Sequence, residues 1–520
     1  MRKIFFVALM TSLLSGLVLN KWTAPASAEP RFGGVLKLSQ RTGQASFGIP
    51  LNVRGKARDI IAWCCDRMVQ RGEEPGTYEG VLAESFELSP DKLSYTFHLR
   101  QGVKFHDGTK FNAQAVKWNW DKVLAVKDVR GVFKKVTSFD ILDDYTIRAN
   151  LTSWDALILE DFRHEASSVI SPTYYEKYGE EWCNTHPIGA GPWVLKQYVP
   201  RLKYVFERNP DYWNKPYPYI DTLELHIIAD PMTAMASFLR GEVDGLDEVD
   251  MVLAKNLTDK GYKTNPLITG GNYCLYGNST SPDSAWSDIR MRQALEYAIN
   301  KERIAESLGQ GFMEPSYEVL RGAHATGDPG TTPRKYDPEK AKQLMAEAGY
   351  KNGLKVKITV LDKFYGDYIV AVQSDLKKVG IDVEILKMPG PIYQEVRFQP
   401  CKGNELRWGR ARGHSGNGIL IYGDSDFTSD CINFPAVKRP EGFDALLDQT
   451  MVEVDLANRA SIIVKMEKLM YDDVFLIPLW NVPDIEFRTP DLKWDPSIRK
   501  HLEYSSEDRQ LHFEIGWLDR

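Results

Sequence analysis

The stretch LAESFELSPDKLSYTFHLRQGVKFHDGT, residues 82–109, has the pattern of paired β-strands. Within it, Tyr95, Phe97 and Leu99 alternate with polar neighbours, which is the period of a strand that buries one face. A Ser-Pro-Asp turn stands before this strand. The stretch therefore predicts a β-hairpin over residues 84–100.

Further elements are predicted around the hairpin. A helix over residues 112–124 and an alternating strand over 145–151 make this part of the chain an α+β lobe. Residues 187–250 hold a glycine-rich turn, two strands and a helix that begins after Asp230, with proline at its first position, and ends at Gly241. This order predicts a second lobe.

Residues 288–386 alternate helices with strands, which predicts an α/β lobe. One helix is predicted over residues 288–308, with an apolar side typical of core packing. Asp337 is the predicted cap of another helix, because proline follows it and Gly349 marks the end. The remaining predicted elements are a strand over 356–361, a helix over 367–379 and a strand over 381–386.

The first 28 residues have the features of a cleavable secretory signal. Two cations precede an apolar run over residues 4–19, and Ala-Ser-Ala at 26–28 supplies the small residues of a cleavage site. We expect the mature chain to begin at Glu29 and to be periplasmic; the alternative is an uncleaved membrane anchor. Because the first cysteine is Cys64, no lipoprotein-type tether is expected.

The expected mature chain carries an excess of acid. Residues 29–520 hold 62 lysines and arginines against 71 acidic residues, which gives a net charge of −9. This sign disfavours nucleic acid as a partner. A chain of 492 residues also exceeds what one hydrophobic core usually organises, so two or more lobes are expected.

Six cysteines stand at positions 64, 65, 183, 274, 401 and 431. An oxidising compartment permits disulfides, and Cys401 and Cys431, which flank one loop-rich stretch, form the predicted pair. The alternative is that the cysteines are small buried hydrophobic residues. No cysteine or histidine spacing typical of a metal or redox site occurs, so no cofactor is expected.

Five further blocks of sequence accompany residues 82–109. They are PIGAGPW at 187–193, RNPDYW at 208–213, LRGEVD at 239–244, DIRMRQALEYAIN at 288–300 and YDPEKAKQLMAEAG at 336–349. In this order the six blocks resemble the extracytoplasmic solute-binding proteins of the peptide, nickel and opine family, also called family 5. The resemblance implies a mixed α/β and α+β fold similar to type II periplasmic binding proteins, with two large lobes around a cleft and a small inserted subdomain.

The resemblance also implies a role and a set of segments. A solute held by groups from both lobes stabilises the closed form, which the permease subunits of an ABC importer then recognise. The implied solute is a peptide, an opine or a similar small molecule, and we expect a monomer. The implied segments are lobe I at 29–62, 183–276 and 488–520, the inserted lobe II at 63–182, and lobe III at 277–487.

One stretch departs from the peptide-binding members that the chain resembles. Those proteins carry an aspartate shortly after a Gly-Trp pair, where it binds the peptide amino terminus, whereas Arg410, Arg412 and His414 stand in the similar stretch at 406–418. Guanidinium groups suit carboxylate or phosphate, so we hypothesise an anionic solute; the alternative is salt bridges on a surface loop. Asp424 and Asp426, further along the chain, carry carboxylates that suit a peptide amine, so a peptide solute is the competing hypothesis.

Aromatic side chains are candidate cleft linings, because planar rings supply apolar area and stacking faces. For each of them the alternative is ordinary core packing. The candidates are Trp63, Tyr276, Trp408, Tyr422 and Trp480.

Other classes of function fit the sequence less well. The run Gly-His-Ser-Gly-Asn at 413–417 misses the final glycine of a nucleophile elbow, so a hydrolase that uses Ser415 is disfavoured and we expect no enzyme. No two of His98, His106 and His414 stand at the i, i+4 spacing of a metal pair, so no metal is expected. An extracytoplasmic receptor or chaperone with the same fold is the alternative to import.

Overall fold

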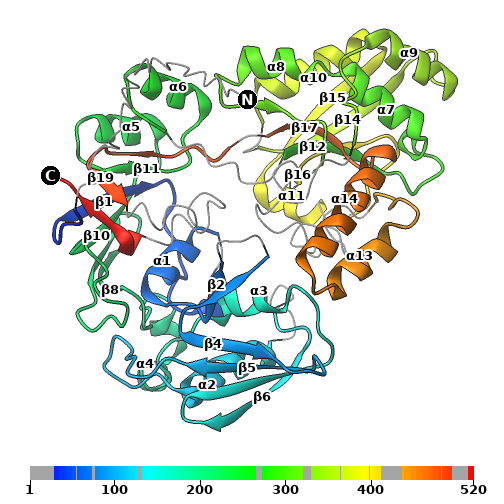
Figure 1. The fold of residues 1–520 in the computed structure, drawn as a ribbon. Coiled ribbons are helices and arrows are strands. Elements are labelled where there is room, and N and C mark those ends of the chain that lie inside the picture. Colours follow the sequence, from blue (N-terminus) through cyan, green and yellow to red (C-terminus); the bar gives the residue numbers. More distant parts are fainter. Residues whose placement is uncertain are drawn as a thin grey trace, which may run out of the picture.

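Three β-sheets of four to six strands organise the chain into two large lobes with a smaller subdomain beside the first (Figure 1). We call the parts built on these sheets lobe I, lobe II and lobe III, in the order of their first strands. The computed structural model describes residues 29–53, 55–72, 76–126, 132–264, 272–319, 330–362, 365–396, 399–411, 436–481, 483–494 and 513–520. In that part of the chain, no helix has the length and apolar character needed to cross a bilayer.

Lobe I is a mixed sheet of six strands in the order β18-β11-β1-β10-β9-β8. β1 pairs in parallel with β10 and β11, whereas β8, β9 and β10 are antiparallel neighbours. α1 buries Ile60 and Ile61 in the same apolar cluster as Leu36 and Phe206 of the sheet. The elements are β1 (Val35–Gln40), α1 (Ala57–Cys64), β8 (Trp193–Val199), β9 (Lys203–Arg208), β10 (Thr222–Ile227), α5 (Pro231–Leu239), β11 (Gly245–Leu246), α6 (Met251–Asp259) and β18 (Phe487–Arg488), with the small pair β19 (Leu492–Trp494) and β20 (Gly516–Leu518).

Lobe II is an antiparallel sheet of four strands in the order β4-β5-β7-β6, and it confirms the predicted hairpin. The predicted helix is also present, as α2, and it begins where the Asn112 side chain accepts a hydrogen bond from Ala115 N at 3.0 Å. Trp120 of α2 packs against Phe97 with ring centroids 5.7 Å apart. The elements are β2 (Val69–Arg71), β3 (Tyr78–Gly80), β4 (Ala83–Leu88), β5 (Ser94–Leu99), α2 (Ala113–Ala125), β6 (Val136–Asp143), β7 (Thr146–Leu151), α3 (Ile158–Arg163) and α4 (Pro172–Cys183).

Lobe III is a mixed sheet of six strands in the order β13-β17-β12-β16-β14-β15. Helices α7 to α10 supply residues to the apolar core on one face, and α13 and α14 supply residues to a separate cluster that includes Cys274 and Tyr276 of β12. The elements are β12 (Asn272–Gly277), α7 (Ile289–Ala298), α8 (Lys301–Leu308), β13 (Glu314–Pro315), α9 (Pro338–Glu347), β14 (Leu354–Leu361), α10 (Asp367–Lys378), β15 (Ile381–Met388), α11 (Gly390–Val396), β16 (Leu406–Ala411), α13 (Phe443–Val452), α14 (Leu456–Asp472) and β17 (Ile477–Asn481).

The single helix predicted over residues 288–308 was wrong, because the structure has two helices, α7 and α8, in its place. Ile299 between them is extended, with φ of −101° and ψ of 117°. The Asn300 side chain accepts a hydrogen bond from Arg303 N at 3.0 Å and so caps the second helix. The backbone N–H of Asn300 donates to Asp375 Oδ2 of α10 at 3.0 Å, so a tertiary contact fixes the break.

Two antiparallel segments connect lobe I to lobe III. Residues 247–271 lead from β11 to β12, and residues 482–486 return from β17 to β18 (Figure 1). Thr264 forms a bridge with Phe487, and its Oγ1 donates to the carbonyl of Glu486 at 2.8 Å. This paired connection has the geometry of a hinge.

The lobe boundaries drawn from the sequence stay predictions. Four of them fall inside elements of the structure: 62/63 lies in α1, 182/183 in α4, 276/277 in β12 and 487/488 in β18.

Candidate functional site

Lobes II and III touch on the side of the molecule away from the hinge. The backbone N–H of Ala156 in lobe II donates to the carbonyl of Met451 in α13 at 2.8 Å. Trp154 and Leu157 flank this contact and pack in one apolar cluster with α13 and α14. The space between the large lobes is therefore bounded by the hinge at one end and by this contact at the other.

A polar cluster lies beside the contact. Burial lowers the pKa of the Arg459 guanidinium on α14, and Tyr78 and Tyr95 of lobe II counter part of this fall. The Tyr78 hydroxyl donates to Glu160 Oε1 at 2.7 Å, and Arg71 Nε contacts the same oxygen at 3.2 Å. Burial raises the pKa of Glu160, but Arg163 and Arg71 outweigh it and hold the pKa well below its usual range.

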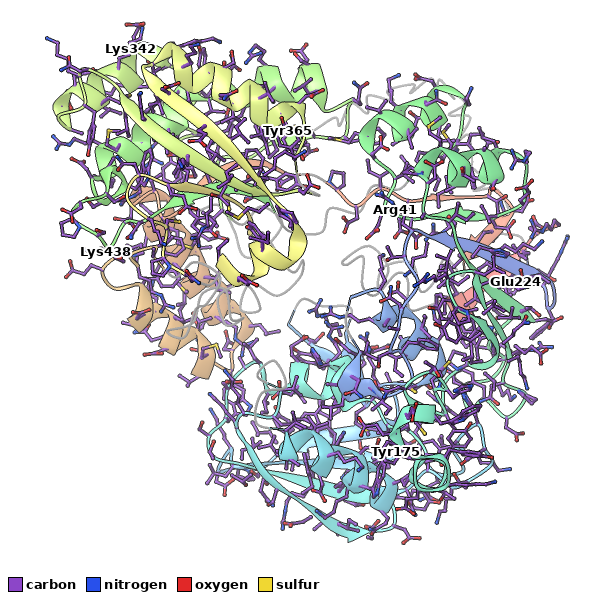
Figure 2. All side chains as sticks on the ribbon, turned by 180° about the vertical axis from the view of Figure 1, so that it is seen from behind. Arg41, Tyr175, Glu224, Lys342, Tyr365 and Lys438 are labelled. Atoms are coloured by element: carbon purple, nitrogen blue, oxygen red, sulfur yellow. The ribbon has the colours of Figure 1, made fainter. Side chains whose placement is uncertain are left out.

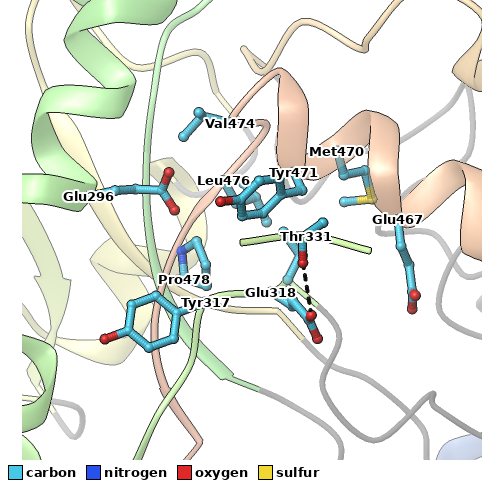
Figure 3. Close-up of a pocket in the computed structure, with 11 residues that line it drawn as sticks. Glu296, Tyr317, Glu318, Thr331, Glu467, Met470, Tyr471, Val474, Leu476 and Pro478 are labelled. Carbon is cyan, nitrogen blue, oxygen red and sulfur yellow. Dashed lines mark hydrogen bonds between the residues drawn. The ribbon is translucent and has the colours of Figure 1, made fainter. Parts of the chain in front are cut away.

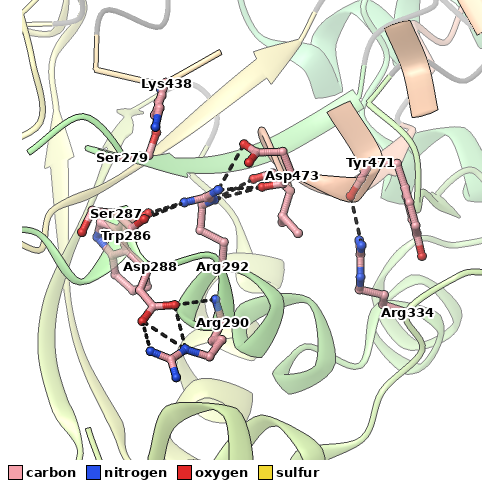
Figure 4. Close-up of polar contacts among 11 residues, drawn as sticks. Ser279, Trp286, Ser287, Asp288, Arg290, Arg292, Arg334, Lys438, Tyr471 and Asp473 are labelled. Carbon is pink, nitrogen blue, oxygen red and sulfur yellow. Dashed lines mark hydrogen bonds and ion pairs between the residues drawn. The ribbon is translucent and has the colours of Figure 1, made fainter. Parts of the chain in front are cut away.

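The α14 helix that carries Arg459 is anchored at its other end. Arg292 of α7 donates from Nη2 to the carbonyl of Asp473 at 2.7 Å and to its Oδ2 at 3.1 Å (Figure 4). Its Nη1 donates to the carbonyl of Trp286 at 2.7 Å. A buried guanidinium therefore fixes the end of α14 against the core of lobe III.

The hinge side of lobe I carries an excess of acid. Arg488 Nη2 pairs with Asp247 Oδ1 at 2.6 Å and with Glu486 Oε2 at 3.0 Å. Burial lowers the pKa of Lys56, but four nearby carboxylates outweigh it and raise that pKa above its usual value. Within the described part of the chain, Lys56 and Arg488 thus lie among four carboxylates, which are those of Asp59, Asp247, Glu248 and Glu486.

Lobe III contains a small pocket lined by residues of α7, α14 and β17, among others (Figure 3). Thr331 Oγ1 donates to Glu318 Oε1 at its rim at 3.2 Å. Glu296 lies in its wall, and burial raises the pKa of that carboxyl against the effect of Lys301 and Arg334. The lining residues are Glu296, Tyr317, Glu318, Val319, Thr331, Glu467, Met470, Tyr471, Val474, Leu476 and Pro478.

The structure places four of the predicted aromatic candidates inside apolar cores, each at most 3% exposed. Trp408 and Trp480 lie together, with ring centroids 6.1 Å apart, and Trp480 Nε1 donates to the carbonyl of Lys301 at 2.8 Å. Trp63 packs in lobe I, and Tyr276 packs below α13 and α14. Core packing accounts for all four positions, and solute contacts at them stay predictions.

The predicted cationic stretch is described only in part. The backbone of Arg410 belongs to β16 and pairs with Tyr273. Cys401 is buried, and its bridge to Cys431, which lies outside the described residues, stays a prediction. The predicted residues that lie outside the described part of the chain are Arg412, His414, Ser415, Tyr422, Asp424, Asp426 and Cys431.

Two of the histidines weighed as metal ligands have structural surroundings. His106 Nε2 contacts the carbonyl of Gly191 at 3.0 Å, and burial lowers the pKa of His106 to about 4. His98 lies 4.0 Å from Glu87 on the lobe II sheet. Among the described residues, no group of three or more metal-ligating side chains is placed to hold an ion.

A family model described as bacterial extracellular solute-binding proteins, family 5 Middle, matches residues 77–408, which is more than half of the chain. The chain belongs to this family. The predicted family 5 resemblance is therefore confirmed. The glutathione-binding protein GsiB of Pectobacterium atrosepticum is 28% identical over 409 residues, which cover 76% of each chain.

Solved structures of periplasmic binding proteins share the fold. The DppA protein of Helicobacter pylori, an ABC transporter-associated periplasmic binding protein in complex with the peptide STSA, has a TM-score of 0.78 at 23% identity and covers 94% of this chain and 99% of its own. AgaA of A. tumefaciens R10, in complex with agropinic acid, has a TM-score of 0.74 at 22% identity, with the same coverage. The predicted type II periplasmic binding protein fold is confirmed, and the named relatives are binding proteins.

Sequence reasoning missed several polar residues of this family 5 chain near the hinge. Arg41, directly after β1, lies on the side of lobe I toward lobe III (Figure 2). The charged cluster around Lys56 was missed because its members come from α1 and from the two segments that connect lobes I and III. No local sequence pattern marks them, because they become neighbours only through tertiary packing.

Proposed function

We propose that this chain is the periplasmic solute-binding subunit of an ABC importer and that it captures a peptide-like solute by closure of lobe III on lobes I and II. It delivers the solute without changing it chemically. The observation that carries this proposal is the pairing of a two-segment hinge with the Ala156–Met451 contact on the opposite side. A solute held between these two points bridges both halves and favours the closed form.

The charges around this space support a solute with an ammonium group. The described residues of the Lys56 cluster include four carboxylates on the hinge side. Carboxylates of this kind attract an ammonium group and repel an anion. The backbone of Arg410, a predicted anion-binding residue, belongs to β16 of lobe III, so a zwitterion suits the charges of both lobes.

Calorimetry with glutathione, the tetrapeptide Ser-Thr-Ser-Ala and agropinic acid tests the proposal. We expect binding by one of the two peptides, and a weaker affinity for the N-acetylated tetrapeptide than for the free one. A ligand at 100 times its Kd stabilises the folded form by about 2.7 kcal/mol, which thermal melting detects. Small-angle scattering with the bound peptide should show a smaller radius of gyration.

Three results count against the proposal. Binding of agropinic acid but of neither peptide refutes the peptide-like class. A radius of gyration that is unchanged at saturation refutes closure. Conversion of glutathione into a product, detected by mass spectrometry after incubation, refutes a pure binding role.

A further inference from the structure

Two buried asparagines lie side by side where lobe III meets the hinge. Asn272 is the first residue of β12, and Asn481 is the last residue of β17. The two residues are directly opposite each other in the antiparallel pair. Their exposed fractions are 1% and 4%, so both amides are shielded from solvent.

The hydrogen bonds of these amides are incomplete. Asn272 Nδ2 donates to Ser316 Oγ at 3.3 Å, to the carbonyl of Glu318 at 2.8 Å and to that of Val319 at 2.7 Å. Within the described part of the chain, Asn272 Oδ1 has no hydrogen-bond partner, and neither does Oδ1 or Nδ2 of Asn481. Buried polar groups almost always have partners, and those without one often mark a functional site.

The register shows which way the pair faces. Side chains alternate across a strand, so Asn272 shares a face of β12 with Cys274 and Tyr276. Both of those residues belong to the cluster with α13, α14 and Ala156 of lobe II. Trp480, next to Asn481, packs instead in the core on the opposite face. The amides therefore lie on the face of lobe III that meets lobe II, at its hinge end.

We propose that Asn481, held beside Asn272, binds an amide group of the solute. A side-chain amide offers an acceptor and two donors, which match the N–H and C=O of a peptide unit. The three bonds from Asn272 Nδ2 fix that side chain and leave its oxygen as a second acceptor at the same place. This assignment rests on the proposed function and makes it specific, because the solute must carry a peptide or similar amide.

The test compares Asn481→Leu, which keeps the volume and removes the hydrogen bonds, with the wild type. Asn256→Leu on the exposed side of α6 is the control. Calorimetry with Ser-Thr-Ser-Ala and with glutathione should show at least a tenfold weaker Kd for Asn481→Leu and no change for the control. The melting temperature of the solute-free variant should equal or exceed that of the wild type, because an unpaired buried amide has been removed.

A second variant and a second ligand separate this role from a structural one. Asn481→Asp keeps the shape and the acceptor but loses both donors, so it should also weaken peptide binding; it takes over the test if Asn481→Leu does not fold. A tetrapeptide analogue with ester links in place of amides should bind the wild type more weakly, with a much smaller loss in Asn481→Leu.

The outcomes distinguish the two proposals. If the wild type binds neither peptide, the proposed function fails and this assignment fails with it. If the wild type binds a peptide and the variants bind it within twofold as well, only the role of Asn481 is refuted. Equal losses for the ester analogue in wild type and Asn481→Leu also refute it.

Discussion

Replacement of Arg334 by alanine should destabilise lobe III by leaving a buried carboxylate without its main partner. Arg334 Nη1 contacts Glu296 Oε2 at 2.7 Å, with side-chain exposures of 11% and 2%. The guanidinium also lies 3.9 Å from the centre of the Tyr471 ring and donates to the Tyr471 carbonyl at 3.0 Å (Figure 4). Burial lowers the pKa of Lys301, the other nearby cation, to about 8, so it compensates only in part.

The size of the effect follows from this burial. Removal of one partner from a buried ion pair costs about 3–5 kcal/mol, and the remaining attraction to Lys301 puts Arg334→Ala at about 3 kcal/mol. For a lobe of about 200 residues, this corresponds to a fall in melting temperature of about 6–12 °C.

The deficit should depend on pH. Burial raises the pKa of Glu296 in the folded protein above its value in the unfolded chain, so the folded state holds the proton more tightly. Stability of the variant relative to wild type should therefore improve as the pH falls from 8 to 5 and worsen as it rises.

Thermal unfolding followed by circular dichroism at both pH values measures this difference. Arg334→Ala combined with Glu296→Gln should recover part of the lost stability, because the unpaired carboxylate is gone; the recovery is incomplete because the buried Lys301 loses the attraction of Glu296. A deficit below about 1 kcal/mol, or an equal deficit at both pH values, would refute the reasoning.

Three further changes have expected outcomes. Gly191→Ala should lower the free energy of unfolding by about 1–3 kcal/mol, and with it the melting temperature, because the new methyl group would lie 2.5 Å from the carbonyl carbon of Cys64. Gly390→Ala should leave the melting temperature unchanged, because the space around Gly390 is open. Ala156→Asp should enlarge the radius of gyration in small-angle scattering by placing a carboxylate in the apolar contact between lobes II and III, whereas Ala156→Ser should leave it nearly unchanged. Glu160→Gln should destabilise the protein at pH 7 in urea unfolding, and this loss should shrink as the pH falls below about 4, because the lowered pKa of Glu160 stabilises the folded state only while the unfolded carboxyl is ionised.

Local sequence signals predicted the local structure well. The alternation around Phe97 and the helix predicted over residues 112–124 depend on neighbours only a few residues away, and both are present in lobe II. The break at Asn300 was missed because the apolar period continues through it and the deciding contact comes from Asp375 on another helix.

The candidate site was harder to predict for the same reason. Asn272 and Asn481 become neighbours only through the register of β12 and β17, which no local pattern encodes. Trp408 and Trp480 are also brought together by that sheet, and the same large rings that suit a solute fill its core. Residue type therefore identified aromatic and charged candidates, and only tertiary packing sorted them.

The two segments that run between lobes I and III have a mechanical consequence. Because Thr264 of one is bridged to Phe487 at the end of the other, the two segments move together as one pivot. Rotation of lobe III about this one pivot would bring the outer surfaces of lobes I and III into the same arrangement whichever solute is bound. Cargo preference can then diverge through a few interior residues while the shape offered to the membrane complex is conserved.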